Sequence, residues 1–217
     1  MRGLWIVFLI VGTTFQVLII QVLVRKALRA YPALLLYSIA SFLATAFATS
    51  AYFNSDLYRR YYWIQDAVMQ CLMFLLVISL IYGAMNHSTR RTVVGHTLVG
   101  GSLLYVLLST YFTRDPHLGY WMTQLGRNLG FLAVILNLVF WAVLIKSRRA
   151  ERTLLMVSGG LGIQMAGKAI GHSLRQMSHS TILQGNLIIV LAQLFCLYIW
   201  WKAFQHYGQN APRSTTS

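Results

Sequence analysis

Long runs of apolar residues, separated by short polar segments, fill almost the whole chain. Each run holds about 20 residues, enough for an α-helix to cross a hydrocarbon core of roughly 30 Å. The runs show no strand-like alternation of polar and apolar positions. In lipid the backbone N–H and C=O groups must be hydrogen-bonded within the protein, which a helix achieves on its own. The sequence therefore predicts an all-α, polytopic bundle of seven transmembrane helices over residues 3–24, 33–53, 62–85, 92–113, 119–145, 153–177 and 182–204.

The composition agrees with a lipid environment and leaves no room for a soluble domain. Hydrophobic residues make up 57% of the 217-residue chain and charged residues only 10%. Soluble domains carry about 25% charged residues. We therefore expect one transmembrane domain over residues 1–205 and a disordered polar tail over residues 206–217. The function must then be carried out by the bundle itself or through a cytoplasmic or membrane protein partner.

The positive charge is distributed unevenly between the two ends of the predicted helices. The net charge is +14, and eleven of the 18 Lys and Arg residues fall at one end against five at the other. By the positive-inside rule the richer end is cytoplasmic, so the N-terminus is outside and the C-terminus is in the cytoplasm. The basic segments are expected to touch membrane lipids, and the charge requires no nucleic-acid partner. Arg25 and Lys26 directly after the first run fit a retained helix rather than a cleaved signal peptide.

The sixth predicted helix carries polar residues along one face. Gln164, Lys168, His172 and Arg175 follow one another at intervals of four, four and three residues. At about 100° per residue these positions form one narrow stripe. Because an unpaired charge inside a membrane is costly, Lys168 in particular requires an explanation.

Polar residues of other predicted helices fall at a similar depth. With a rise of about 1.5 Å per residue, they lie roughly 6–13 Å below the outer surface. We call this group the polar slab, and its members are Asp66, Gln70, Gln124, Arg127, Asn128, Lys168, His172 and Asn186. Together with Gln164, which is deeper on the same face of the sixth helix, they are the candidate ligand-binding residues.

The polar slab admits two interpretations. In the structural one, Asp66 pairs with Arg127 or Lys168 and holds the bundle together, because intramembrane charges usually pair and face the interior. In the functional one, a single carboxylate facing two cations leaves a positive excess, so an outward pocket binds a small anion or a lipid headgroup. His172 would make such binding sensitive to pH. The other acidic residues are predicted to lie in loops: Asp56, Asp115 and Glu151.

Several cofactor chemistries are excluded by position. A retinal-binding lysine belongs near the middle of the last helix, where this chain has only Lys202 at the inner end. A haem held by two histidines needs both at one depth, but His96 and His172 fall near opposite ends of their helices. A catalytic zinc site needs several His and acidic ligands, which this chain does not bring together. We predict no cofactor, no metal site and no enzymatic activity.

Small residues and cysteines add expectations about helix packing. Glycines one turn apart let neighbouring backbones approach closely, and such pairs occur in the fifth and sixth helices: Gly126 with Gly130, and Gly167 with Gly171. The two cysteines, Cys71 and Cys196, fall in different helices at different depths. We therefore expect both to be unpaired packing residues.

Three stretches resemble a group of uncharacterised bacterial seven-helix integral membrane proteins of about this length. They are the basic first loop running into RAYPALLLYS, the segment YYWIQDAVMQ opening the third helix, and the basic fifth loop before the Gly-rich sixth helix. Those relatives often carry an acidic residue near the position of Asp66 and another that closes the third helix, where residues 82–85 here are not acidic. The resemblance implies a multi-pass protein of the bacterial cytoplasmic (inner) membrane and carries no known activity.

These patterns favour a receptor-like or lipid/small-anion-binding module with a polar pocket in the outer half of the bundle. A small-solute transporter is the alternative, suggested by a faint repeat in which GLW at residue 3 and GYW at residue 119 each open a helix. A transporter needs polar residues that continue to the inner face, where this chain has only Gln21, His96 and Asn137. A purely structural membrane subunit is the third possibility.

Overall fold

The fold is all-α in a computed structural model that describes residues 2–28, 30–51, 55–84, 91–112, 118–146, 152–177 and 179–205. These ranges contain seven α-helices, two short helical turns of other types and no strand, which confirms that the fold is all-α. The predicted tail over residues 206–217 lies outside them. In chain order the elements are α1 (Arg2–Val22), the π-helical turn η1 (Leu23–Ala27), α2 (Pro32–Ala51), α3 (Ser55–Ala84), α4 (Arg91–Phe112), α5 (Leu118–Lys146), α6 (Arg152–Met177), the 3-10 turn η2 (His179–Thr181) and α7 (Ile182–Gln205).

The helix boundaries follow the apolar runs closely, with two differences. The third helix begins at Ser55 rather than at residue 62, so Asp56 lies in the helix and not in a loop as predicted. Apolar periodicity marks only the part of a helix that is buried or in lipid, and polar residues can extend it beyond that part. At the end of α1 the chain continues as the π-helical turn η1, which carries Arg25 and Lys26.

Four helices within the described residues are long and apolar enough to cross a membrane. The corresponding spans are Ile6–Ala27, Ile64–Ala84, Arg152–Met177 and Ile182–Gln205. The apolar parts of α2 and α5, Pro32–Phe47 and Asn128–Ala142, are shorter. Together these helices indicate that the protein is associated with a membrane.

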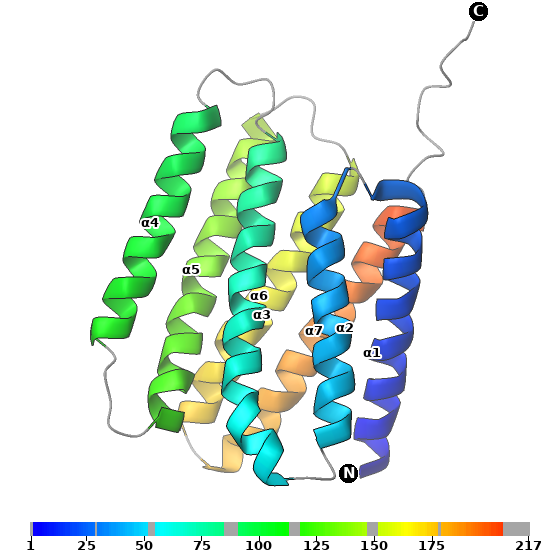
Figure 1. Ribbon diagram of the computed structural model, residues 1–217, viewed down its shortest axis with the longest axis vertical. Helices are drawn as coiled ribbons and strands as arrows, with labels where there is room; N and C mark the ends of the chain where they lie inside the picture. Colours follow the sequence, from blue (N-terminus) through cyan, green and yellow to red (C-terminus); the bar gives the residue numbers. More distant parts are fainter. Residues whose placement is uncertain are drawn as a thin grey trace, which may run out of the picture.

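Six of the helices form a closed ring, and α4 lies outside it. Going around the ring, α1 packs on α2, α2 on α3, α3 on α5, α5 on α6, α6 on α7, and α7 on α1. Among the described residues, α4 packs mainly on α3 and α5, and both of these contacts are smaller than those within the ring. In Figure 1, α6 and α7 pass behind α2 and α3, and α4 forms one edge. Side chains that point into the ring can therefore meet from helices far apart in the sequence.

The pairing of α6 with α7 depends on glycines. A Cβ atom at Gly167 would overlap Ala192 Cβ, and one at Gly171 would lie 2.8 Å from the Gly185 carbonyl oxygen. On the other side of α6, a Cβ at Gly130 of α5 would lie 3.3 Å from Ala169. The predicted close packing at Gly130, Gly167 and Gly171 is confirmed, while the surroundings of Gly126 lie outside the described side chains.

The largest buried side chain, Trp200 of α7, anchors the core against α6. Its indole Nε1 donates a hydrogen bond to the Val157 carbonyl oxygen over 2.9 Å. A Cβ at Gly160 would lie 3.0 Å from the indole ring, so the glycine provides the space that the ring occupies. Trp200 also makes an edge-to-face contact with Tyr37 of α2. This packing fixes the rotation of α6 about its axis and therefore the direction of its polar face.

Candidate functional site

The polar face of α6 points toward α2, α3 and α7. Gln164 and His172 are buried, with 3% and 4% of their surface exposed, and Lys168 and Arg175 are half-buried. Three of these residues contact other helices: Gln164 contacts α2 and α7, His172 approaches α3, and Arg175 contacts α7. The regular spacing in the sequence therefore becomes a set of contacts across the ring.

His172 faces Asp66, the acidic residue predicted to lie within the membrane. Its Nε2 atom is 4.0 Å from Asp66 Oδ2, and the Asp66 side chain is 25% exposed. The His172 Nδ1 atom is buried without a hydrogen-bond partner among the described residues. Gln70 lies one turn along α3 from Asp66 and is buried. The interaction between His172 and Asp66 is an ion pair only when the imidazole is protonated.

Lys168 has no acidic partner in the part of the chain that the structure describes. It is half-buried and makes no hydrogen bond or ion pair there, and the described contact of Asp66 is with His172. The side chain of Arg127, the other cation predicted in the polar slab, lies outside the described side chains. With His172 neutral, Lys168 and Arg175 face a single carboxylate, so this face of α6 carries an excess positive charge.

Arg175 and Asn186 join the ends of α6 and α7. Arg175 Nε donates a hydrogen bond to Asn186 Oδ1 over 2.7 Å. A Cβ at Gly185 would lie 3.3 Å from the Arg175 side chain, so the glycine allows this arginine to lie along α7. Arg175 of the α6 stripe and Asn186 of the polar slab are therefore neighbours, about one turn of helix beyond His172.

Asn128 belongs to a different interface from the rest of the polar slab. Its Nδ2 atom donates to Ser109 Oγ of α4 over 3.2 Å, and its carbonyl oxygen accepts from the Tyr105 hydroxyl at 3.3 Å. The α6 side of α5 is formed by Gly130 instead. Gln124, one turn before Asn128, is half-buried. Similar depth thus did not bring Asn128 together with His172, because the two residues face different helices.

Two buried polar clusters lie deeper than the polar slab and were not predicted. In the first, Gln164 Nε2 donates to the Tyr37 hydroxyl oxygen over 2.7 Å, and Cys196 Sγ donates to Gln164 Oε1 over 3.4 Å. In the second, the amides of Gln16 and Gln193 both donate to Ser41 Oγ, over 3.0 and 3.4 Å. Glutamines within apolar helices indicate buried polar contacts from the sequence alone. Which residues they contact depends on the rotation of each helix.

No group of three or more His, Cys, Asp or Glu residues that could hold a metal ion occurs among the described residues. Both cysteines are free, as predicted, and Cys196 is buried as a packing residue, whereas the exposed position of Cys71 differs from the packing role predicted for it. Comparisons with protein-family models, with curated proteins and with solved structures found no match for this chain.

Proposed function

We propose that the protein is a multi-pass membrane protein whose α6 face binds a small anion or an anionic lipid headgroup. Its seven helices would span a bacterial cytoplasmic membrane with the N-terminus outside, and the α6 face would open toward the outer half. The protein would act as a receptor-like binding module. The excess of Lys and Arg at the end where α1, α3 and α5 finish supports this orientation.

The observation that carries the proposal is the half-buried Lys168, which has no acidic partner among the described residues. A lysine within an apolar helix is costly in a membrane, and such residues usually pair or mark a ligand path. Asp66 is already opposite His172 at 4.0 Å. An anion bound next to Lys168 would supply the missing counter-charge, and the half-buried position leaves access for it.

The surrounding groups favour a carboxylate or phosphate oxygen as the bound atom. Lys168 offers three N–H donors as a point charge, and Arg175 on the same face of α6 adds a second positive charge. Charge-assisted hydrogen bonds of this kind are stronger than neutral ones. Asp66 would repel a second anion, so the face is suited to one acidic group at a time.

A second candidate is a small-solute transporter that uses the same face. The clusters around Gln164 and Ser41 extend polar groups from the slab toward the middle of the ring. Beyond them, the buried side chains of Trp200, Phe140 and Phe204 fill the interior. Because this apolar part would have to open during transport, the arrangement favours binding without transport.

The test compares the wild-type protein with Lys168→Met and with the matched control Lys202→Met. Lys202 stacks on Trp201 at the opposite end of the bundle, so the control removes the same charge elsewhere. Native mass spectrometry in mild detergent, with dioleoyl phosphatidylglycerol, inorganic phosphate or acetate added, should give an adduct on the wild type and on Lys202→Met. Lys168→Met should bind one ligand fewer than the wild type, and Lys168→Arg should bind as many as the wild type.

The three probes separate the possible ligands and the alternatives. Binding of phosphatidylglycerol alone identifies a lipid headgroup, whereas binding of phosphate or acetate identifies a small anion. Uptake of the bound anion into proteoliposomes would favour the transporter. If none of the probes binds, or if Lys168→Met binds as many ligands as the wild type, the α6 face is a structural element and the proposal is wrong.

A further inference from the structure

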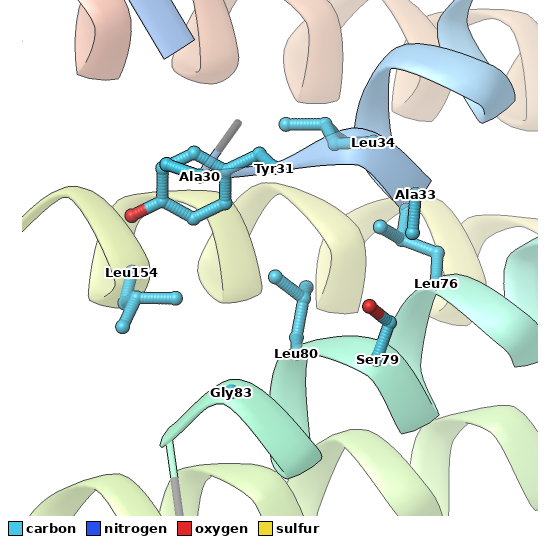
Figure 2. A pocket seen from close by; sticks show the side chains of 9 residues that line it. All are labelled: Ala30, Tyr31, Ala33, Leu34, Leu76, Ser79, Leu80, Gly83 and Leu154. Atoms are coloured by element: carbon cyan, nitrogen blue, oxygen red, sulfur yellow. The ribbon is translucent and has the colours of Figure 1, made fainter. Parts of the chain in front are cut away.

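A separate cleft lies at the other end of the bundle, where α2 and α6 begin and α3 ends. Its volume is about 230 Å³. Its lining comes from three helices and the segment before α2, and Figure 2 shows these side chains: Ala30, Tyr31, Ala33, Leu34, Leu76, Ser79, Leu80, Gly83 and Leu154. None of these residues belongs to the polar face of α6 described above.

The cleft is lined by both apolar and hydroxyl groups. Four leucines from α2, α3 and α6 supply the apolar part, and the hydroxyls of Tyr31 and Ser79 lie among them (Figure 2). The Tyr31 ring is held by an edge-to-face contact with Phe204. Since a water molecule occupies about 30 Å³, the volume corresponds to roughly eight waters, which suits part of a lipid rather than a whole one.

Exposed basic side chains lie close to the cleft in the chain. Arg25 and Lys26 are exposed on η1, a few residues before Tyr31, and Arg152 is exposed two residues before Leu154. In the sequence, the segments that follow α1, α3 and α5 contain one acid, Glu151, and nine basic residues. The basic residues are Arg25, Lys26, Arg29, Arg90, Arg91, Lys146, Arg148, Arg149 and Arg152. Positive charge therefore predominates in the sequence around the cleft.

The cleft lies near the ends of the apolar spans of three helices. The apolar spans of α1 and α3 end at Ala27 and Ala84, and that of α6 begins at Arg152. The lining residues lie within a few turns of these ends, where apolar side chains give way to basic ones. In a membrane this is the level at which lipid phosphates meet the acyl chains.

We propose that this cleft is a binding site for an anionic phospholipid. The first part of an acyl chain would lie against Leu34, Leu80 and Leu154, and the glycerol ester oxygens would accept hydrogen bonds from the Tyr31 and Ser79 hydroxyls. The phosphate and an acidic headgroup would be held by the basic side chains of η1 and of the start of α6. The inference requires a membrane-embedded bundle but does not depend on ligand binding at Lys168.

Gly83 allows a test that changes no charge. It lines the cleft, and a Cβ atom there would meet nothing within 4 Å, so Gly83→Phe can introduce a large side chain at the cleft with no clash at its Cβ atom. Gly100 on α4 also has nothing within 4 Å and lies outside the cleft, which makes Gly100→Phe the matched control. Binding is measured by native mass spectrometry during titration with dioleoyl phosphatidylglycerol and, separately, with dioleoyl phosphatidylcholine.

We expect the wild type and Gly100→Phe to prefer phosphatidylglycerol over phosphatidylcholine, and Gly83→Phe to lose at least about tenfold in phosphatidylglycerol affinity. Replacing Arg25, Lys26 or Arg152 by Gln should weaken binding about fivefold for each charge removed, the usual worth of one basic residue near an anionic surface. The charge variants alone would not separate a site from general attraction, whereas Gly83→Phe does.

The same titration distinguishes this site from the α6 face. Retention of phosphatidylglycerol by Lys168→Met together with its loss in Gly83→Phe supports the cleft, whatever happens at Lys168. Loss in Lys168→Met with retention in Gly83→Phe places the lipid at the α6 face and overturns the proposal. Equal binding of phosphatidylcholine and phosphatidylglycerol by the wild type overturns it as well, because the basic groups would then have no role.

Discussion

His172 Nε2 lies 4.0 Å from Asp66 Oδ2 and thereby relates α6 to α3, two helices that α5 separates in the ring. The separation is longer than a hydrogen bond, so the attraction is electrostatic and depends on the charge of the imidazole. Asp66, the one acidic residue of the polar slab, therefore has a histidine as its described neighbour. Lys168, one turn away on the same helix face, is left without an acidic partner in the described part of the chain.

A double-mutant cycle should detect this relationship. Asp66→Asn and His172→Gln should each lower the free energy of unfolding in detergent, and the double variant should lose less than the sum of the two. We expect a coupling of about 0.5–1.5 kcal/mol, the range of polar pairs between membrane helices. Thermal or denaturant unfolding provides the measurement. Strict additivity of the two changes would show that the residues do not interact.

The glycines between α6 and α7 should tolerate no side chain. Gly167→Leu should lower the free energy of unfolding by about 1–3 kcal/mol or more, because the new side chain overlaps Ala192 and forces the helices apart. Gly100→Leu, placed where nothing lies within 4 Å, serves as the control and should change stability little. Equal melting temperatures for the two variants in the same detergent would contradict the observed α6–α7 packing.

Trp200 should contribute more to stability than its neighbour Trp201. Trp200→Phe removes the hydrogen bond to the Val157 carbonyl and leaves a small cavity, which together should cost about 1–3 kcal/mol. Trp201 is half-buried, and Trp201→Phe should cost less than about 1 kcal/mol. Unfolding followed by far-UV circular dichroism compares the two. A larger loss for Trp201→Phe would mean that the assigned rotation of α7 is incorrect.

The buried pair of Gln164 and Tyr37 should behave as one unit. Gln164→Leu leaves the Tyr37 hydroxyl without this donor and should cost about 1–3 kcal/mol. Tyr37→Phe should cost about 1 kcal/mol, and the double variant should be more stable than the sum of the single losses predicts. Gln21→Leu, at an exposed position on α1, controls for the removal of an amide. A destabilisation by Gln21→Leu as large as that by Gln164→Leu would refute the assignment.

The two cysteines should differ in their reaction with a thiol-reactive coumarin maleimide in detergent. Cys71 is exposed and should react in the folded protein, whereas Cys196 is fully buried and should react only on unfolding. Cys196→Ala and Cys71→Ala isolate the two sites. The reaction of Cys196 in the Cys71→Ala variant then reports the unfolding transition itself. Rapid labelling of Cys196 at low temperature would contradict its burial beside Gln164.

Much of the fold follows from one-dimensional features of the chain. The lengths of the apolar runs located the helices, because each buried or lipid-facing helix must be apolar over most of its length. The boundary that differed, the start of α3 at Ser55, lies in a polar stretch where hydropathy carries no signal. The glycines at 167 and 171 also showed from sequence alone where backbones approach closely, although not that Ala192 and Gly185 of α7 are their neighbours.

The candidate site was predictable only along single helices. The spacing of Gln164, Lys168 and His172 defines a face of α6 whatever surrounds it, since the helix repeat fixes the direction of each side chain relative to the others. Depth estimates correctly related Asp66 to His172 but also grouped Asn128 with them. Asn128 instead faces Ser109 of α4, because the rotation of α5 is set by the contact of Gly130 with Ala169.

The sequence by itself thus determined the helical class, the extent of the helices, the unequal charge at their ends and the polar stripe of α6. Only the tertiary structure decided that Asp66 meets His172 rather than Lys168, that Gln164 reaches Tyr37, and that a cleft forms beside Gly83. The physical reason is that apolar length and charge are properties of each segment alone. The rotation and order of the helices depend instead on how large and small side chains from different segments fit together.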